Sequence, residues 1–215
     1  NRMLEEHLMS HKAADQSRTD RRLRAEQAAR AARRRRRLRI IIGAAGALAL
    51  VAVVTAMMLT SRPESSDAIR TAPDFTLTDT AGNPHTLAQH RGENVLLYFS
   101  EGAGCQSCIV QMGEIEKQAD ALAQEDVTVL PIVMNTREQI TADMAANGVT
   151  TPFLLDDGTV SEAYGTLGKG MHAGLPGHSF VLIDKQGQQR WYGEYPSMWL
   201  APEDLLDQVR SKLGA

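Results

Sequence analysis

The sequence contains very little cysteine. Cys105 and Cys108 are the only two in 215 residues, and Gln106 and Ser107 separate them. A disulfide between them would close a very small loop and remove little entropy from the unfolded chain, so a purely structural bridge is a weak explanation for the pair. A redox centre and a metal-binding pair are the other candidate roles, and the position of the pair in the fold and in the cell decides among the three.

Charge is absent from residues 40–60, IIIGAAGALALVAVVTAMMLT. A helix needs about 20 apolar residues to cross the hydrocarbon core of a bilayer, whereas the apolar region of a cleaved signal is usually about 7–15 residues long. No convincing small-x-small cleavage site follows the segment, and no cysteine beside it could carry a lipid anchor. We therefore predict a retained, single-pass transmembrane helix over residues 40–60.

Basic residues are concentrated before this span. Residues 1–39 contain 13 Lys and Arg but 5 Asp and Glu, although the whole chain has a net charge of −3. Because arginines that flank a span remain in the cytoplasm, we predict a basic cytoplasmic tail over residues 1–39 and an extracytoplasmic C-terminal part at the cell membrane. The arginine run can also contact anionic headgroups, and we do not expect nucleic-acid binding.

The remainder of the chain predicts one compact domain. The polar stretch 62–74 contains two prolines and indicates a linker, which we place at residues 61–71. Residues 72–215 are numerous enough to bury their own core, and the sequence has no internal repeat. Apolar runs and turn residues predict strands or hairpins at 74–87, 94–100, 127–134, 153–158 and 179–195, and helices at 105–125, 136–148, 159–168 and 201–214. This alternation predicts an α/β domain with a mixed central sheet and helices on both faces.

The cysteine pair follows the first buried strand and begins a helix. This is the carboxyl edge of the sheet, where α/β proteins place their chemistry. A helix N-terminus stabilises negative charge, and C-x-x-C thiols at such positions have pKa values of about 3.5–7.5 instead of about 8.5. Because the N-terminal sulfur of such a pair is usually the more exposed, we predict Cys105 as the nucleophile and Cys108 as the resolving cysteine. Gly102 and Gly104 leave the approach open.

Residues 72–213 resemble the membrane-anchored TlpA-like, or redoxin, proteins of the alkyl hydroperoxide reductase/thiol-specific antioxidant (AhpC/TSA) superfamily. The resemblance rests on the C-x-x-C pair and on three stretches, APDFTLTDTAGNPHTLAQHRG (72–92), NVLLYFS (94–100) and FVLIDKQGQQRWYGEY (180–195). It implies a thioredoxin-like fold and thiol–disulfide oxidoreductase activity in cell redox homeostasis. It also implies no cofactor, protein disulfide or dithiol substrates, and an electron donor or acceptor.

The sequence departs from the usual family pattern around the cysteines. Gly104 stands where a tryptophan often precedes the first cysteine, and the dipeptide between the cysteines lacks the usual proline. Thioredoxin-like folds commonly carry a cis-proline at the position of Gly177, but here Pro176 lies one residue earlier. We expect Pro176, Gly177 and His178 to form a loop that faces the substrate.

Two other functions are alternatives. A thiol peroxidase, or peroxiredoxin-like antioxidant, would resemble its family in a Pro-x-x-x-Thr/Ser-x-x-Cys stretch and a later arginine, but YFSEGAGC has no proline and Gly177 stands at the arginine's expected place. A Sco-like copper-binding protein would use soft ligands, for which Cys105, Cys108, His172 and His178 are the candidates. The Sco-type proteins carry a C-x-x-x-C pair, which is one residue wider than the pair here.

Overall fold

The computed structural model describes residue 30 and residues 33–59 and 62–214. The chain divides into two units that meet between Met58 and Leu59. Arg33–Leu59 form one continuous helix with exposed apolar side chains, which accounts for most of the described first unit and is long and apolar enough to cross a membrane. The predicted tail over residues 1–39 lies mostly outside the described residues.

The second unit is built on one mixed sheet. Nine strands belong to it in the described part of the chain: β1 (Glu64–Ser66), β2 (Arg70–Thr71), β3 (Thr76–Asp79), β4 (Pro84–Thr86), β5 (Asn94–Phe99), β6 (Val127–Val133), β7 (Leu154–Leu155), β8 (Ser179–Ile183) and β9 (Gln188–Glu194). Their order is β1-β9-β8-β5-β6-β7-β3-β4, and β2 also pairs with β9. The central strands β5, β6 and β7 are parallel, whereas β8 runs antiparallel to β5.

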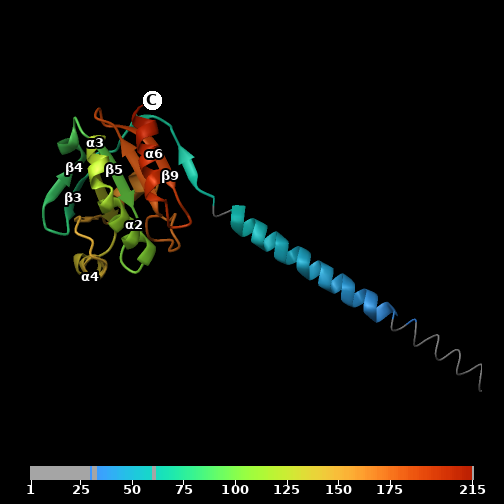
Figure 1. The fold of residues 1–215 in the computed structure, drawn as a ribbon. Coiled ribbons are helices and arrows are strands. Elements are labelled where there is room, and N and C mark those ends of the chain that lie inside the picture. The colour runs from blue at the N-terminus through green and yellow to red at the C-terminus, as the bar shows by residue number, and fades with distance from the viewer. Residues whose placement is uncertain (1–29, 31–32, 60–61, 215) are drawn as a thin grey trace, which may run out of the picture. The chain divides into compact units, whose positions relative to one another are not determined.

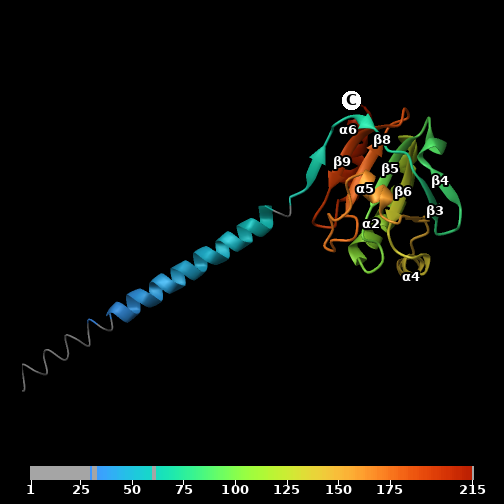
Figure 2. The same cartoon turned by 180° about the vertical axis from the view of Figure 1, so that it is seen from behind.

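Helices cover both faces of this sheet, as predicted. Figure 1 shows α2 (Gln106–Lys117) and α6 (Pro202–Leu213) in front of the strands, and Figure 2, from behind, shows α5 (Thr159–Ala163) over the other face. The alternating side chains of β5 explain why two cores form. Leu96 and Tyr98 pack with α2 and α4 (Arg137–Asn147), and Val95, Leu97 and Phe99 pack on the opposite side. All six residues of β5 are buried, so the strand fixes the start of the following loop.

The predicted linker over residues 61–71 was wrong in part, because β1 and β2 lie within it. Both strands pair antiparallel with β9. A polar sequence can join a sheet edge in this way because ladder hydrogen bonds come from the backbone and not from the side chains. The indole N–H of Trp191 also donates to Ser65 Oγ at 3.0 Å. The polar stretch is therefore an edge of the folded domain.

The helix predicted over residues 105–125 is in fact two helices. The first, α2, ends at Lys117, and α3 (Ala119–Gln124) follows after Gln118, whose φ and ψ are −95° and 9°. The ends predicted for α4 are confirmed. Thr136 caps its N-terminus by accepting the N–H of Gln139, and Gly148 ends it with a φ of 69°.

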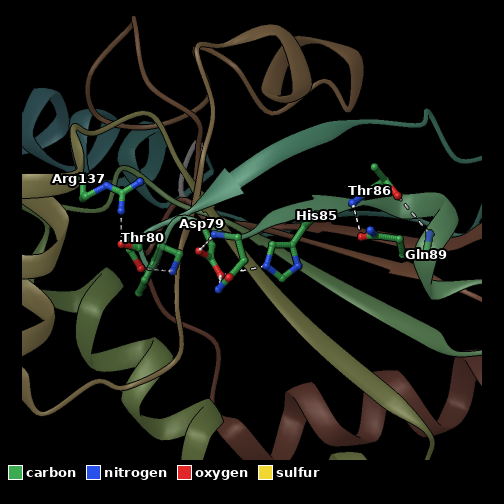
Figure 3. A network of polar contacts seen from close by, with 8 residues as sticks. Asp79, Thr80, His85, Thr86, Gln89 and Arg137 are labelled. Carbon is green, nitrogen blue, oxygen red and sulfur yellow. Dashed lines mark hydrogen bonds and ion pairs between the residues drawn. The ribbon is translucent and has the colours of Figure 1, made fainter.

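A buried carboxylate organises the β3–β4 hairpin (Figure 3). Asp79 accepts the backbone N–H of Asn83 at 2.8 Å, and it contacts His85 Nε2 at 3.0 Å. Burial acts to raise its pKa, but the hydrogen bonds from Asn83 and His85 outweigh burial and lower the pKa to about 2. Nearby, Arg137 donates to the carbonyl oxygen of Thr80 at 2.8 Å, which attaches the hairpin to α4.

Candidate active site

Cys105 and Cys108 form a disulfide directly after the carboxyl end of β5. Cys105 is the N-cap residue of α2, Cys108 lies in its first turn, and their Cα atoms are 5.3 Å apart. Cys105 is partly exposed, whereas Cys108 has no exposed surface. An attacking group can therefore reach the first sulfur more easily than the second.

The loop between β5 and Cys105 is held by α4 and by Asn135, which lies two residues before that helix. The N–H of Ala103 donates to Asn135 Oδ1 and the N–H of Gly104 donates to Asp143 Oδ2, both at 2.8 Å. Gly102 and Gly104 have φ values of 70° and 87°, which favour glycine. A Cβ on Gly102 would collide with the Asn135 side chain, but a Cβ on Gly104 would meet nothing within 4 Å. The loop is thus packed on one side and open beside Cys105.

Two features favour a thiolate at Cys105 when the pair is reduced. Its side chain lies at the N-terminus of α2, where backbone N–H groups lack helical partners. In addition, Ser107 Oγ lies 3.4 Å from Cys105 Sγ and can donate its hydrogen to the sulfur. Both groups stabilise negative charge on sulfur, which is the reactive form of cysteine.

A network of buried polar side chains lies behind Cys108. Tyr98 Oη is 3.0 Å from the carbonyl oxygen of Cys108 and 3.2 Å from His178 Nδ1. His178 Nε2 lies 3.3 Å from Gln111 Oε1, which also accepts the N–H of Leu200 at 2.8 Å. Burial lowers the pKa of His178 to about 3, so the imidazole is neutral at pH 7. Burial also raises the pKa of Tyr98.

The loop expected to face the substrate is buried in this structure. Pro176, Gly177 and His178 all lie inside the domain, and the described residues contain no cis peptide bond. The preceding segment folds back over the loop, because Leu167 forms a bridge with Pro176 and the Gly177 N–H donates to the Thr166 carbonyl at 2.8 Å. A Cβ on Gly177 would approach Lys169 Cβ to 2.7 Å, so this cover is closely packed.

The two candidate metal-binding histidines have separate environments. The His172 side chain is 69% exposed and its Nδ1 lies 2.8 Å from the buried carboxylate of Glu101, whereas His178 is enclosed with Tyr98 and Gln111. Among the residues that the structure describes, no three His, Cys, Asp or Glu side chains gather closely enough to hold a metal ion. The described geometry therefore adds no support to the copper-binding alternative.

Analysis of the sequence did not identify three buried polar residues near the cysteines. Each of them nevertheless stands at a position where a polar residue is unexpected. Tyr98 carries the one hydroxyl in the apolar run NVLLYF, and Glu101 is a charged residue two positions after the strand. Gln111 falls on the apolar side of α2, next to the buried Met112 and Cys108. A polar group in an apolar position predicts a buried hydrogen-bond partner, but it does not say which one.

Comparison with known proteins supports the same fold. The model of the AhpC/TSA family matches residues 69–191, which is more than half of the chain. The chain belongs to the AhpC/TSA family. The reduced 2-Cys peroxiredoxin of Plasmodium vivax has the same thioredoxin-like fold, with a TM-score of 0.60, 20% sequence identity, and coverage of 68% of this chain and 96% of that structure.

The curated relatives of this AhpC/TSA member divide between two named activities. Alkyl hydroperoxide reductase E of Mycobacterium tuberculosis is 31% identical over 121 residues, which is 54% of this chain and 78% of the relative. Thiol-disulfide oxidoreductase ResA of Geobacillus thermodenitrificans is 31% identical over 120 residues, which is 55% of this chain and 64% of the relative. Two further M. tuberculosis relatives are matched over 63% of their length. The protein is a redoxin with a C-x-x-C pair.

Proposed function

We propose that this protein is a thiol–disulfide oxidoreductase that cycles between the Cys105–Cys108 disulfide and the dithiol. The observation that carries the proposal is the asymmetry of the pair, because a partly exposed sulfur at a helix N-cap is bonded to a wholly buried one. This is the arrangement expected of a nucleophile and a resolving cysteine. The match to a ResA protein supports the same reaction.

In the reducing direction, the Cys105 thiolate attacks one sulfur of a partner's disulfide. The partner's S–S bond breaks, its second sulfur leaves as a thiolate and is protonated, and Cys105 becomes joined to the partner. Cys108 then attacks the Cys105 sulfur, forms the internal disulfide and releases the partner's remaining thiol. The partner has gained two electrons and two protons, and a separate dithiol donor must regenerate the pair. The oxidised pair can run the same steps in reverse.

We further propose that the protein is anchored in the cell membrane with a cytoplasmic N-terminus and an extracytoplasmic domain. The exposed apolar helix Arg33–Leu59 and the arginines at its N-terminal end support this orientation. Disulfide exchange also suits an oxidising compartment. The partners are then extracytoplasmic proteins with cysteines, together with an electron donor or acceptor.

Trapping of mixed disulfides tests the exchange reaction. In the full chain, Cys108→Ser should accumulate partner proteins that are joined through Cys105 and released by dithiothreitol, because the resolving thiol is missing. Cys105→Ser is the matched control and should trap far fewer, since Cys108 is buried. Equal trapping by the two variants, or no trapping by either, would overturn the assignment of Cys105 as the nucleophile.

Thiol peroxidase activity is a second candidate, favoured by the match to an alkyl hydroperoxide reductase. In that reaction Cys105 attacks a peroxide oxygen to give a sulfenic acid and water or an alcohol, and Cys108 then condenses with it and releases water. Stoichiometric hydrogen peroxide added to the reduced chain distinguishes the two functions. Peroxidase function requires oxidation of Cys105 much faster than that of a free thiol, and an equal rate removes this candidate.

A further inference from the structure

Glu101 is a buried carboxylate near the cysteine pair that thiol exchange, as described above, does not use. Its side chain is 4% exposed, and the residue lies between the end of β5 and the turn that leads into α2. Burying a carboxylate is unfavourable unless hydrogen bonds satisfy its oxygens. Glu101 therefore needs partners, and these come from a part of the chain 71 residues away.

His172 bonds to both oxygens of this carboxylate. Its backbone N–H donates to Glu101 Oε1 at 3.0 Å, and its ring Nδ1 lies 2.8 Å from Glu101 Oε2. A carboxylate only accepts hydrogen bonds, so Nδ1 carries a hydrogen and donates it. The imidazole ring is 69% exposed, so its contribution here is this hydrogen bond and not the burial of its surface. We call these two contacts the Glu101–His172 clamp.

The segment that carries His172 is closed at its base and packs against Glu101. The Gly168 N–H donates to the Leu175 carbonyl at 2.9 Å, and the Leu175 N–H donates to the His172 carbonyl at 3.0 Å. A Cβ on Gly170 would collide with Glu101 Oε1, so the backbone approaches the carboxylate closely. The segment thus holds His172 in a defined place beside Glu101.

The clamp acts on the turn that carries Cys105. The Cys105 N–H donates to the Gly102 carbonyl at 3.0 Å, so residues 102–105 form a β-turn. The Cα atoms at the ends of such a turn are less than about 7 Å apart, and Glu101 directly precedes it, so the Cα atoms of Glu101 and Cys105 are within about 11 Å. The N–H groups in the middle of the turn are held from the side of α4, as described above. The clamp is a further anchor for the same turn.

We propose that Glu101 and His172 position the turn that carries Cys105, and that they thereby favour the internal disulfide over the dithiol. This proposal rests on the proposed thiol exchange. In the disulfide, the S–S bond already fixes the turn to α2, so the clamp forms at little cost in conformational entropy. In the dithiol the turn has more freedom, and the clamp must order it. The clamp is therefore stronger in the disulfide state, and by linkage it stabilises that state by the same factor.

The same positioning favours the resolving step. When a partner is joined to Cys105, the clamp keeps the Cys105 sulfur beside α2, which raises its effective concentration at Cys108. Glu101 and His172 act through the turn, and so they are positioning residues for the exchange reaction.

Equilibration of the full chain with glutathione, in detergent micelles, tests the clamp. One glutathione disulfide oxidises the dithiol to the internal disulfide and yields two molecules of glutathione, and trapping of the free thiols gives the equilibrium constant. His172→Ala should lower this constant by about fivefold or more, because coupling between two sites is typically about 5–150-fold. His172→Asn should restore most of it, since its side-chain N–H stands as many bonds from the backbone as Nδ1 does.

Met171→Ala is the matched control, because Met171 precedes His172 in the same segment and is 77% exposed. Its equilibrium constant should equal that of the unaltered chain. In a chain that already carries Glu101→Ala, His172→Ala should cause no further fall, since the two residues act as one unit.

The clamp is overturned if His172→Ala and Met171→Ala give equal equilibrium constants, even where His172→Ala lowers the thermal stability. A merely structural contact would stabilise the disulfide and the dithiol alike. Equal losses in His172→Ala and His172→Asn would also overturn it. The rate at which the reduced full chain reacts with DTNB tests the exchange reaction separately, and a rate no faster than that of glutathione would overturn the proposed function, whatever the equilibrium constants show.

Discussion

At the scale of single residues, the two cysteines are three positions apart but lie in opposite environments. Cys105 has the N-terminus of α2 and the Ser107 hydroxyl beside it, and both stabilise a thiolate. Cys108 has no exposed surface, and burial of a thiol disfavours its charged form. A difference in pKa between the two sulfurs therefore follows from their positions, and it assigns the first attack to Cys105.

The contact between Ser107 and Cys105 predicts a change in thiol pKa. Ser107→Ala should raise the pKa of Cys105 by about one unit, since a hydrogen bond to a charged group contributes about 1.5–3 kcal/mol and this site is partly exposed. Thiolate absorbance followed over a pH titration, in the Cys108→Ser background, measures the pKa. Ser107→Thr retains the hydroxyl and is the control; equal pKa values for the two variants would refute the role of this contact.

The sequence was sufficient to place the cysteines but not the residues around them. A strand followed by a helix puts Cys105 at the sheet's carboxyl edge whatever the rest of the fold, because the two elements are adjacent in the chain. The burial of His178 depends on Gln111 and Tyr98, which are 67 and 80 residues away. The pattern of neighbouring residues in the sequence carries no information on contacts between such distant residues. The sequence alone therefore could not show that the loop predicted to face the substrate is buried.

At the scale of elements, the loop between β5 and α2 is the part most sensitive to substitution. Gly102→Ala should lower the free energy of unfolding by more than about 2 kcal/mol, because a positive φ costs about 1–2 kcal/mol and the Cβ also collides with Asn135. Gly104→Ala has the same φ penalty without the collision, and should cost about 1 kcal/mol. Thermal unfolding of the oxidised chain, followed by circular dichroism, compares the two, and equal losses would contradict the packing described here.

The β3–β4 hairpin predicts acid sensitivity. The pKa of Asp79 falls from 3.8 to about 2 on folding, so its carboxylate stabilises the fold by about 2 kcal/mol above pH 4, and this contribution is lost as the pH falls from about 4 to 2. Asp79→Asn should remove it, leaving a variant that is less stable at pH 7 but nearly equal to the unaltered chain at pH 2. Denaturation over this pH range measures the effect. Asp207→Asn, on the exposed face of α6, should show no such convergence.

The sequence predicted an element correctly where neighbouring residues determine it, and it missed elements that form only by pairing with a distant strand. The caps of α4 are encoded by Thr136, Gln139 and Gly148 within the helix itself. The edge strands β1 and β2 carry no apolar pattern, because they contribute backbone hydrogen bonds to β9 and little buried surface. The sequence pattern of these two strands therefore cannot be distinguished from that of an unstructured polar linker.

At the scale of the whole molecule, the apolar helix predicts a retained membrane anchor. The full chain should remain in the membrane fraction after a carbonate wash, whereas a chain that lacks residues 1–60 and carries an export signal should be soluble. Protease added outside the cell membrane should digest the C-terminal domain and spare the N-terminal tail. Recovery of a shortened, soluble form from the full-length gene product would show that the helix is a cleaved signal.

The reduction potential of the Cys105–Cys108 pair tests the central claim most directly. It is obtained by equilibrating the full chain in glutathione or dithiothreitol buffers of known ratio and trapping the free thiols. A pair that cycles in thiol–disulfide exchange is predicted to titrate between about −300 and −120 mV, the range of known exchange proteins. A potential well below about −300 mV would mark a structural disulfide and contradict the account.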